Sequence, residues 1–108
     1  MGIETSCDET SVSIIDTNSK ILSNTTFSQI NIHKKFGGVV PEIASKNHLL
    51  KIIPVIKESL KESKKTINDI SLISVTNGPG LISCLMIGAA SAKALGMIHK
   101  IKVSPINH

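Results

Sequence analysis

The first 16 residues constrain the fold of this chain more than any other segment. A short apolar stub at the very start and an alternating stretch at residues 12–16 flank a run rich in acids and hydroxyl residues. Alternation with a period of two is typical of a strand with one buried face. The segment therefore predicts two antiparallel strands joined by a tight hairpin. Its tip would present backbone N–H groups, hydroxyls and carboxylates, which suit a phosphate and a divalent cation, although they are also ordinary turn residues.

Length and composition favour one globular unit. The 108 residues are 41% hydrophobic and 19% charged, with a net charge of +4 that is compatible with an RNA partner. Phe27 and Phe36 are the only aromatic residues, which excludes the stacking platforms of many single-stranded nucleic-acid binders. Cys7 and Cys84 are too few for a disulfide framework. With no long apolar span and no signal-peptide pattern, we expect a cytoplasmic protein that does not contact a membrane.

The order of the predicted elements defines the fold class. Turn signals separate three leading strands, which we expect to form an antiparallel meander. Two helical segments then fall where parallel strands require crossover connections. The order β-β-β-α-β-α-β predicts an α/β fold with a mixed sheet, the ribonuclease-H-like half domain. The strands are predicted at residues 2–6, 12–16, 21–29, 70–75 and 101–104, a loop at 30–40, and the helices from 41 to about 61 and at 81–97.

The first long helix is predicted from apolar residues that recur at steps of three and four, which indicate one buried face. Pro41 suits the first turn of this helix, where its missing N–H group does no harm. Pro54 lies inside the pattern and predicts a kink or a split. The predicted buried face consists of Leu49, Ile52, Ile53, Ile56 and Leu60.

A second candidate site is the run Asn77-Gly78-Pro79-Gly80, directly before the second long helix. Glycines let the chain turn sharply and let an incoming group approach the backbone. The first turn of a helix offers unpaired N–H groups and a positive dipole end to an anion. A tight connection without any ligand explains the same residues. Because ligands of such folds bind beyond the strand ends, we expect this turn to meet the acidic hairpin tip.

Three motifs add a family resemblance. Residues 4–10 read ETSCDET, residues 36–48 read FGGVVPEIASKNH, and residues 77–81 read NGPGL. In this order and spacing they resemble the tRNA N6-adenosine threonylcarbamoyltransferase family, formerly called glycoprotease or O-sialoglycoprotein endopeptidase. A non-catalytic paralogue is also similar, but the second motif fits the catalytic branch better. The resemblance implies one ribonuclease-H-like half of an actin-like ATPase-domain (ASKHA) fold, with residues 1–108 as its N-terminal subdomain.

The resemblance also implies a reaction. Family members transfer a threonylcarbamoyl group from threonylcarbamoyl-adenylate to N6 of adenosine 37 in tRNAs that read codons beginning with A. An adenylate or ATP-type ligand and an iron or zinc ion are implied, the metal being held by an H-x-x-x-H pair and a distant aspartate. His108 matches the first histidine, and the second would lie beyond the end of the sequence. We therefore expect the chain alone to be inactive. Expected partners are tRNA, the adenylate, proteins of the transfer complex, and a second copy through an exposed cleft or helix face.

The candidate site residues combine the hairpin tip, the glycine turn and the resemblance. Asp8 and Glu9 are the candidate catalytic residues, with electrostatic or proton-transfer roles. His33, His48 and His99 show no partner in the sequence and are interpreted as surface or packing residues. The candidate cofactor-binding residues are Ser6, Cys7, Thr10, Gly78 and Gly80, and the candidate metal ligand is His108.

Two other classes of function stay open. A metal-dependent nuclease would use Glu4, Asp8, Glu9 and Asp16 near one sheet edge, although the chain offers no later acids for such a site. An interaction module would dock on a family partner through exposed helices and a sheet edge. The peptidase of the older family name has no support, because neither an H-E-x-x-H helix nor a Ser/His/Asp arrangement is present.

Overall fold

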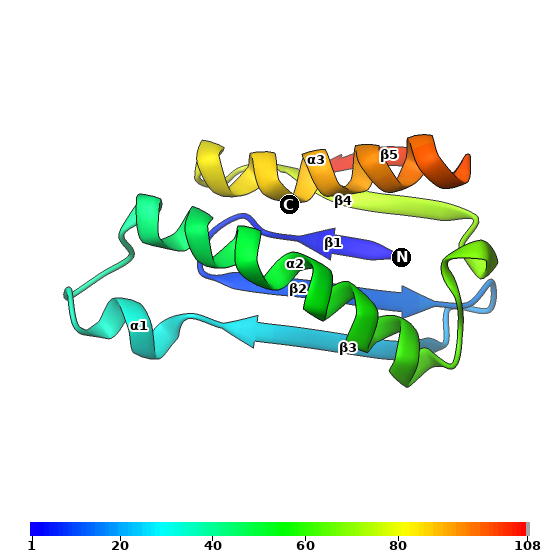
Figure 1. The fold of residues 1–108 in the computed structure, drawn as a ribbon, viewed down its shortest axis with the longest axis horizontal. Coiled ribbons are helices and arrows are strands. Elements are labelled where there is room, and N and C mark those ends of the chain that lie inside the picture. Colours follow the sequence, from blue (N-terminus) through cyan, green and yellow to red (C-terminus); the bar gives the residue numbers. More distant parts are fainter. Residues whose placement is uncertain (108) are drawn as a thin grey trace.

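The computed structural model describes residues 1–107, which form a five-stranded sheet with two long helices packed on it (Figure 1). The strands are β1 (Gly2–Glu4), β2 (Glu9–Ile15), β3 (Ile21–Ser28), β4 (Leu72–Gly78) and β5 (Lys102–Asn107). The helices are α1 (Ile30–Lys34), α2 (Pro41–Ser63) and α3 (Ile82–His99), with a 3₁₀ turn η1 (Ile67–Asp69). The spatial order is β3-β2-β1-β4-β5, with the first three strands antiparallel and β4 and β5 parallel to β1. The predicted fold class is confirmed.

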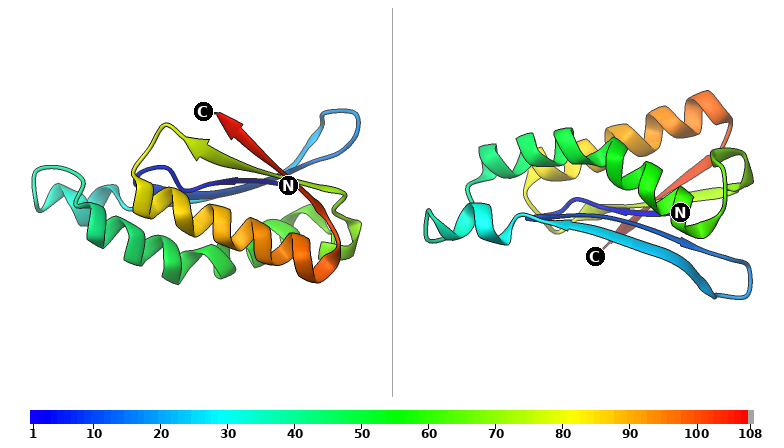
Figure 2. Two further views of the ribbon diagram at one scale, coloured as in Figure 1. Left: turned by 90° about the horizontal axis from the view of Figure 1, so that it is seen from above. Right: turned by 60° about the horizontal axis from the view of Figure 1, so that its bottom comes forward.

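Both long helices lie on the same face of the sheet (Figure 2). The helix α2 connects β3 with β4, and α3 connects β4 with β5, so both crossovers run in the same direction across the sheet and cover the same face. Within residues 1–107 the opposite face carries no helix (Figure 2). A shallow hollow of about 230 Å³ on that bare face is lined by both apolar and small polar residues, among them Ile106, Ser11, Ser13, Ser74 and Thr76.

The core lies between the sheet and the helices. Aliphatic side chains from β1, β2 and β4 meet apolar residues of α2 and α3, and each such side chain contributes roughly 1.5–3 kcal/mol by leaving water. Ordinary apolar packing therefore holds these strands against the two helices. The buried core includes Ile3, Val12, Ile14, Ile52, Val55, Ile56, Ile73, Val75 and Ala92.

Two expectations about α2 are corrected in part. The helix continues through Pro54 as one element, so of the predicted kink or split the split is excluded. Leu49 and Ile53, from the predicted buried face, are 63% and 49% exposed. His48 and Ser59 occupy inward positions instead, and both side chains form hydrogen bonds to groups of the sheet or its adjoining loop. A hydrophobic pattern misses such positions because their polarity is satisfied by partners distant in sequence.

Two further expectations are also corrected. The predicted loop at residues 30–40 begins with the short helix α1, in which the N–H groups of Ile32 and His33 donate to the carbonyl of Gln29. The helix α3 is long and apolar enough to cross a membrane by length and composition. Its small residues Cys84 and Gly88 are nevertheless buried against the sheet side, and a packed apolar helix passes the same test, so this is weak evidence for a membrane span.

Candidate functional site

The two candidate loops meet at one edge of the sheet. Residues 5–8 follow β1 and residues 79–81 follow β4, and these parallel neighbours end at the same edge. The N–H group of Leu81 donates to the carbonyl of Ser6 at 2.8 Å. At Gly80 an added Cβ would lie 2.7 Å from both the Cβ and the carbonyl oxygen of Ser6, so only glycine fits. The predicted meeting of the two loops is confirmed.

A second contact joins the first loop to α3. The buried Thr5 hydroxyl donates to the carbonyl of Cys84 at 2.7 Å and accepts from the N–H group of Gly88 at 3.1 Å. These two backbone groups are the pair that a regular α-helix joins, so the hydroxyl sits at the helix backbone itself. A Cβ at Gly88 would lie 2.6 Å from the Thr5 Oγ1 atom. Close approach of loop and helix therefore requires glycine here as well.

Three successive carbonyls of the first loop are held by three different elements. The carbonyls are those of residues 6–8, and their donors are the Leu81 N–H group, the Nε2 atom of His48 and the N–H group of Gln29. The distances are 2.8, 2.8 and 2.9 Å in that order. The donors lie directly before α3, on α2 and directly before α1. The loop is thus fixed by the helical side of the molecule rather than by its own hairpin alone.

The same contacts turn two N–H groups of the loop away from the protein. In a trans peptide, the C=O of one residue and the N–H of the next point in opposite directions. Since the carbonyls of Ser6 and Cys7 face inward, the N–H groups of Cys7 and Asp8 face outward. Among residues 1–107, no hydrogen bond uses either of these two N–H groups. Adjacent free N–H groups of this kind favour an anion.

The acidic residues of the loop differ in their surroundings. Both carboxylate oxygens of Glu4 accept from Ser6, one from its N–H group and one from its hydroxyl, each at 2.8 Å. The Ser6 hydroxyl is therefore engaged within the loop. Asp8 is half-buried and Glu9 is exposed, so their carboxylates can be reached from solvent. Asp8 in the loop and Glu9 at the start of β2 are therefore the acids in this region that are open to a ligand or a cation.

Cys7 and Thr10 lie on opposite sides of the loop. The Cys7 side chain is exposed, and partial desolvation followed by the negative charges of Asp8 and Glu4 raises the pKa of its thiol. The thiol is therefore protonated near neutral pH and is a poor nucleophile. Thr10 is fully buried, and its hydroxyl forms a 2.8 Å hydrogen bond with Nδ1 of His48. This places Thr10 beneath the loop rather than on its open side.

The helix α3 begins at the same edge. Its N-cap residue Leu81 makes no side-chain cap, and its first turn contains no acidic residue. The first N–H groups of a helix lack partners within it, so those of Ile82 and Ser83 are available to an anion. Gly78 lies at the end of β4, where the nearest atom to an added Cβ is the Asn107 Oδ1 atom at 3.9 Å. Unlike at Gly80, the protein itself does not require glycine at this position.

Sequence reasoning missed the two side chains that organise this region. His48 is fully buried, and both of its ring nitrogens form hydrogen bonds. Gln29 is also fully buried, and its side chain donates to the carbonyl of Ala44 and pairs with Nε2 of His33. A usable signal was the four-residue step from Ala44 through His48 to Ile52, which is the inward stripe of α2. No such signal marks Gln29.

No metal site is formed by the described part of the chain. Within residues 1–107, no three His, Cys, Asp or Glu side chains are placed to hold a metal ion. The candidate ligand His108 lies outside the described residues. The acids of the nuclease alternative also do not gather, because Glu9 begins β2 and Asp16 follows its far end, roughly 20 Å away at the usual strand rise. Asp16 instead accepts hydrogen bonds from the N–H groups of Asn18 and Lys20 in its own turn.

Sheet order and crossovers define the class of protein as a ribonuclease-H-like α/β unit. Solved structures share this fold. YeaZ from Pseudomonas aeruginosa matches with a TM-score of 0.73 and 14% identity, covering 98% of this chain and 41% of that chain. A structure titled an uncharacterized protein with similarity to peptidase YEAZ, also from Pseudomonas aeruginosa, matches with a TM-score of 0.75 and 16% identity over the same shares.

Sequence comparisons identify the family. The sequence model of the tRNA N6-adenosine threonylcarbamoyltransferase (TsaD) family matches residues 20–108, and the chain belongs to this family. Enzymes of that name from Dehalococcoides mccartyi, Fusobacterium nucleatum and Bacillus anthracis are each 49% identical over all 108 residues. The chain spans about one third of their length, namely 33%, 32% and 32%. The family resemblance of the three motifs is confirmed.

Proposed function

We propose that the first loop and the start of α3 bind the phosphate of threonylcarbamoyl-adenylate, in the transfer of a threonylcarbamoyl group to N6 of adenosine 37 of tRNA. The observation that carries this function is the contact between Ser6 and the Gly80-Leu81 turn. One hydrogen bond at this contact joins two of the family motifs directly. Around this contact, the N–H groups of Cys7 and Asp8 and the first turn of α3 supply donors for phosphate oxygens.

In the proposed reaction, the N6 amine of adenosine attacks the carbonyl carbon of the threonylcarbamoyl group. A C–N bond forms, the C–O bond to the phosphate breaks, and adenylate leaves with the bonding electrons. The amine loses one proton, which Asp8 or Glu9 would accept, or whose developing charge they would stabilise; the partial exposure of Asp8 and the exposure of Glu9 support this role. The donors around the phosphate stabilise the leaving group.

The family resemblance implies iron or zinc, which when bound would polarise the carbonyl or hold the phosphate. The described residues do not fit such an ion on their own, since no three ligand-type side chains converge within residues 1–107. No step is therefore assigned to a metal, and His108 stays a proposed ligand that needs others.

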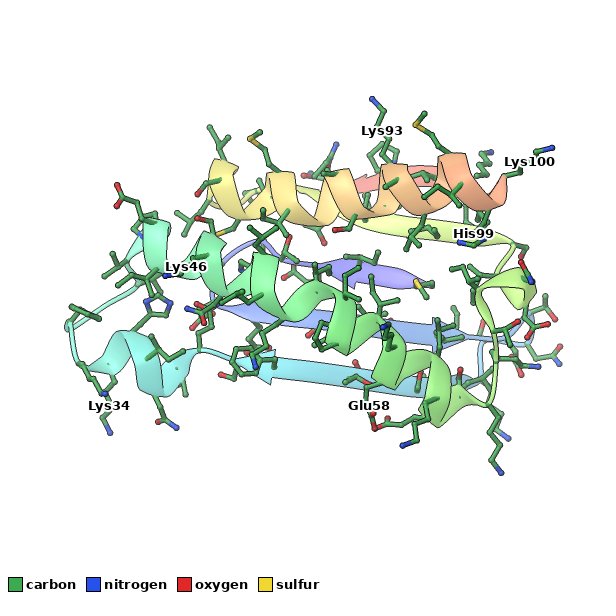
Figure 3. All side chains as sticks on the ribbon, viewed as in Figure 1. Lys34, Lys46, Glu58, Lys93, His99 and Lys100 are labelled. Carbon is green, nitrogen blue, oxygen red and sulfur yellow. The ribbon has the colours of Figure 1, made fainter. Side chains whose placement is uncertain are left out.

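For the RNA substrate, the chain offers dispersed positive charge. Lys34 and Lys46 lie toward the α1 end of the helical layer, and Lys93 and Lys100 lie along α3 (Figure 3). All four are exposed. Lysines of this kind would give a sequence-independent, salt-dependent affinity for tRNA phosphates. A tRNA-modifying role of this kind also favours the cytoplasm as the compartment.

A titration with adenosine monophosphate (AMP) tests the phosphate site. We expect the amide resonances of Cys7, Asp8, Ile82 and Ser83 to shift, because these N–H groups meet the phosphate. The Gly80→Ala variant should bind AMP roughly tenfold more weakly, because the added methyl separates the two loops. Gly38→Ala is the control, since an added Cβ there meets nothing within 4 Å. If the only amide resonances that shift belong to the other end of the sheet, the phosphate site is contradicted. This outcome is seen with the wild-type chain alone and needs neither variant.

An activity assay tests the second part of the function. The purified chain, given threonylcarbamoyl-adenylate and tRNA, is expected to form no modified adenosine on its own, because it spans about a third of its relatives. Efficient modification by the chain alone would contradict this expectation.

An interaction module is the second candidate function. It is favoured by apolar side chains on the outer sides of the two long helices, among them Leu49 and Ile53 on α2 and Ile82 and Met86 on α3. These side chains favour association with a second copy of the chain or with a protein of the transfer complex. Sedimentation should show concentration-dependent dimers. A monomer at high concentration would count against self-association.

A further inference from the structure

The buried side chain of His48 contacts the candidate phosphate loop directly. It lies on α2, 41 residues from Cys7 in sequence, and its Nε2 atom is 2.8 Å from the Cys7 carbonyl oxygen. A carbonyl only accepts hydrogen bonds, so Nε2 must carry the proton. In the neutral ring Nδ1 is then an acceptor, and the Thr10 hydroxyl donates to it at 2.8 Å. Both edges of the ring are therefore used, one by the loop and one by Thr10 in β2.

We propose that His48 is a positioning residue that aims the Asp8 N–H group at the bound phosphate, an inference that rests on the proposed function. The C=O of Cys7 and the N–H of Asp8 belong to one planar peptide. By holding the carbonyl inward, the Nε2–H group of His48 holds that N–H outward. The neighbouring carbonyls of Ser6 and Asp8 are fixed by backbone donors, so His48 supplies the one side-chain anchor among the three.

The second buried histidine shows that this contact is specific. Nδ1 of His33 accepts from the N–H group of Val40 at 3.1 Å, and its Nε2 pairs with the Gln29 side chain at 2.7 Å. His33 therefore fastens the segment between α1 and α2 and makes no direct hydrogen bond to residues 5–8. Two histidines of similar burial thus hold different segments.

Two amide substitutions separate the two edges of the His48 ring. Glutamine places its amide nitrogen close to the position of Nε2, so His48→Gln keeps a donor for the Cys7 carbonyl. Asparagine places its amide near Nδ1, so His48→Asn keeps a partner for Thr10 and loses the donor to the loop. Both variants replace the ring by an amide, and they differ chiefly in which contact survives.

The first measurement follows the loop itself by amide hydrogen exchange of Leu81 and Gln29, whose N–H groups bond the carbonyls on either side of Cys7. In His48→Asn their exchange should accelerate roughly tenfold, as expected for the loss of one buried hydrogen bond. In His48→Gln it should stay within roughly twofold of wild type. Ser59→Ala is the matched control, because it removes a buried hydroxyl of α2 that bonds the Val12 carbonyl far from the loop.

The second measurement is the affinity for AMP. His48→Asn should weaken binding roughly tenfold, while His48→Gln and Ser59→Ala stay close to wild type. A ¹⁵N spectrum of wild type should show Nε2 protonated and Nδ1 bare. Equal effects of the two His48 variants, or exchange in His48→Asn no faster than in Ser59→Ala, would overturn the positioning role. Absence of AMP binding in wild type would instead overturn the phosphate site, and the exchange rates would still decide whether His48 anchors the loop.

Discussion

The candidate loop and the larger hollow lie at opposite ends of the sheet and differ in how closely the residues around them are packed. At the end where β1 and β4 finish, loop carbonyls are held by three elements, and two glycines have no room for a methyl group. At the opposite end a hollow of about 520 Å³ lies between the end of β2, the start of β4 and η1. It is lined by turn and strand residues such as Met1, Asp16 and Lys65, and by none of the candidate site residues. The larger hollow is thus remote from the candidate chemistry.

This difference shows at which end a fixed backbone position would contribute to phosphate binding. A phosphate bound by N–H groups needs those groups fixed within a fraction of an ångström, which the crowded end supplies. The hollow end has no comparable set of inward-held carbonyls among the described residues. If this contrast is correct, an added methyl group should have a large effect at Gly88 and a small effect at Gly2. Gly96 is a crowded exception near the start of β5, since an added Cβ there would lie 2.6 Å from a methyl group of Val103 and 2.8 Å from the Ile101 carbonyl oxygen.

The largest effect is expected for Gly88→Ala. The added Cβ would lie 2.6 Å from Thr5 Oγ1, and 3.4 Å from a methyl group of Val75. Overpacking of a buried contact costs about 3 kcal/mol. Chemical denaturation should therefore show a clear loss of unfolding free energy with an unchanged denaturant slope. A loss below about 1 kcal/mol would mean that α3 moves away from the loop freely, and it would contradict a rigid contact between them.

A smaller effect is expected for Thr5→Ala, which removes the hydroxyl between Cys84 and Gly88. The loss should be about 2 kcal/mol, since the two helix groups can pair with each other once the hydroxyl is gone. The double variant Thr5→Ala with Gly88→Ala provides the sharper measurement. Because Thr5→Ala removes the atom that the new methyl would strike, the double variant should be more stable than the sum of the two losses predicts. Simple additivity would contradict the direct contact.

At the hollow end, Asp69 should give a modest effect that depends on pH. The N–H group of Thr66 donates to its carboxylate at 2.8 Å, and this bond lowers the pKa of Asp69, with smaller contributions from the Thr66 hydroxyl and Lys65. A lowered pKa stabilises the fold above the usual aspartate pKa, and this contribution is lost as the pH falls through the folded-state pKa.

Melting temperatures of wild type and Asp69→Asn test this effect. The variant should melt slightly lower at neutral pH, and the two curves should converge in acid, where the carboxylate is protonated. A difference that persists unchanged into acid would show that the capping geometry, rather than the charge, is responsible.

Much of this arrangement could be predicted from the sequence, and the failures share one physical cause. The alternation of strands and crossover helices fixed the fold class, and the acidic and glycine motifs located the crowded edge. The inward face of α2 was missed because His48 and Ser59 are polar and satisfied by distant partners. The helix α1 was missed because the buried side chains of Gln29 and His33 are held by hydrogen bonds to each other and to the backbone of Ala44 and Val40. Hydrophobic periodicity predicts which apolar side chains are buried, but it does not predict the burial of polar side chains that have hydrogen-bond partners.

The smallest effect is expected for Gly2→Ala, which makes the same chemical change as Gly88→Ala at the other end of β1. The added Cβ would meet only the Ser13 Oγ atom, at 3.1 Å. That oxygen ends a short side chain on the face of the sheet without helices, so it can rotate away. The unfolding free energy should change by less than about 0.5 kcal/mol. A loss close to that of Gly88→Ala would show that Ser13 does not rotate away, and that a methyl group is no better accommodated at Gly2 than at Gly88.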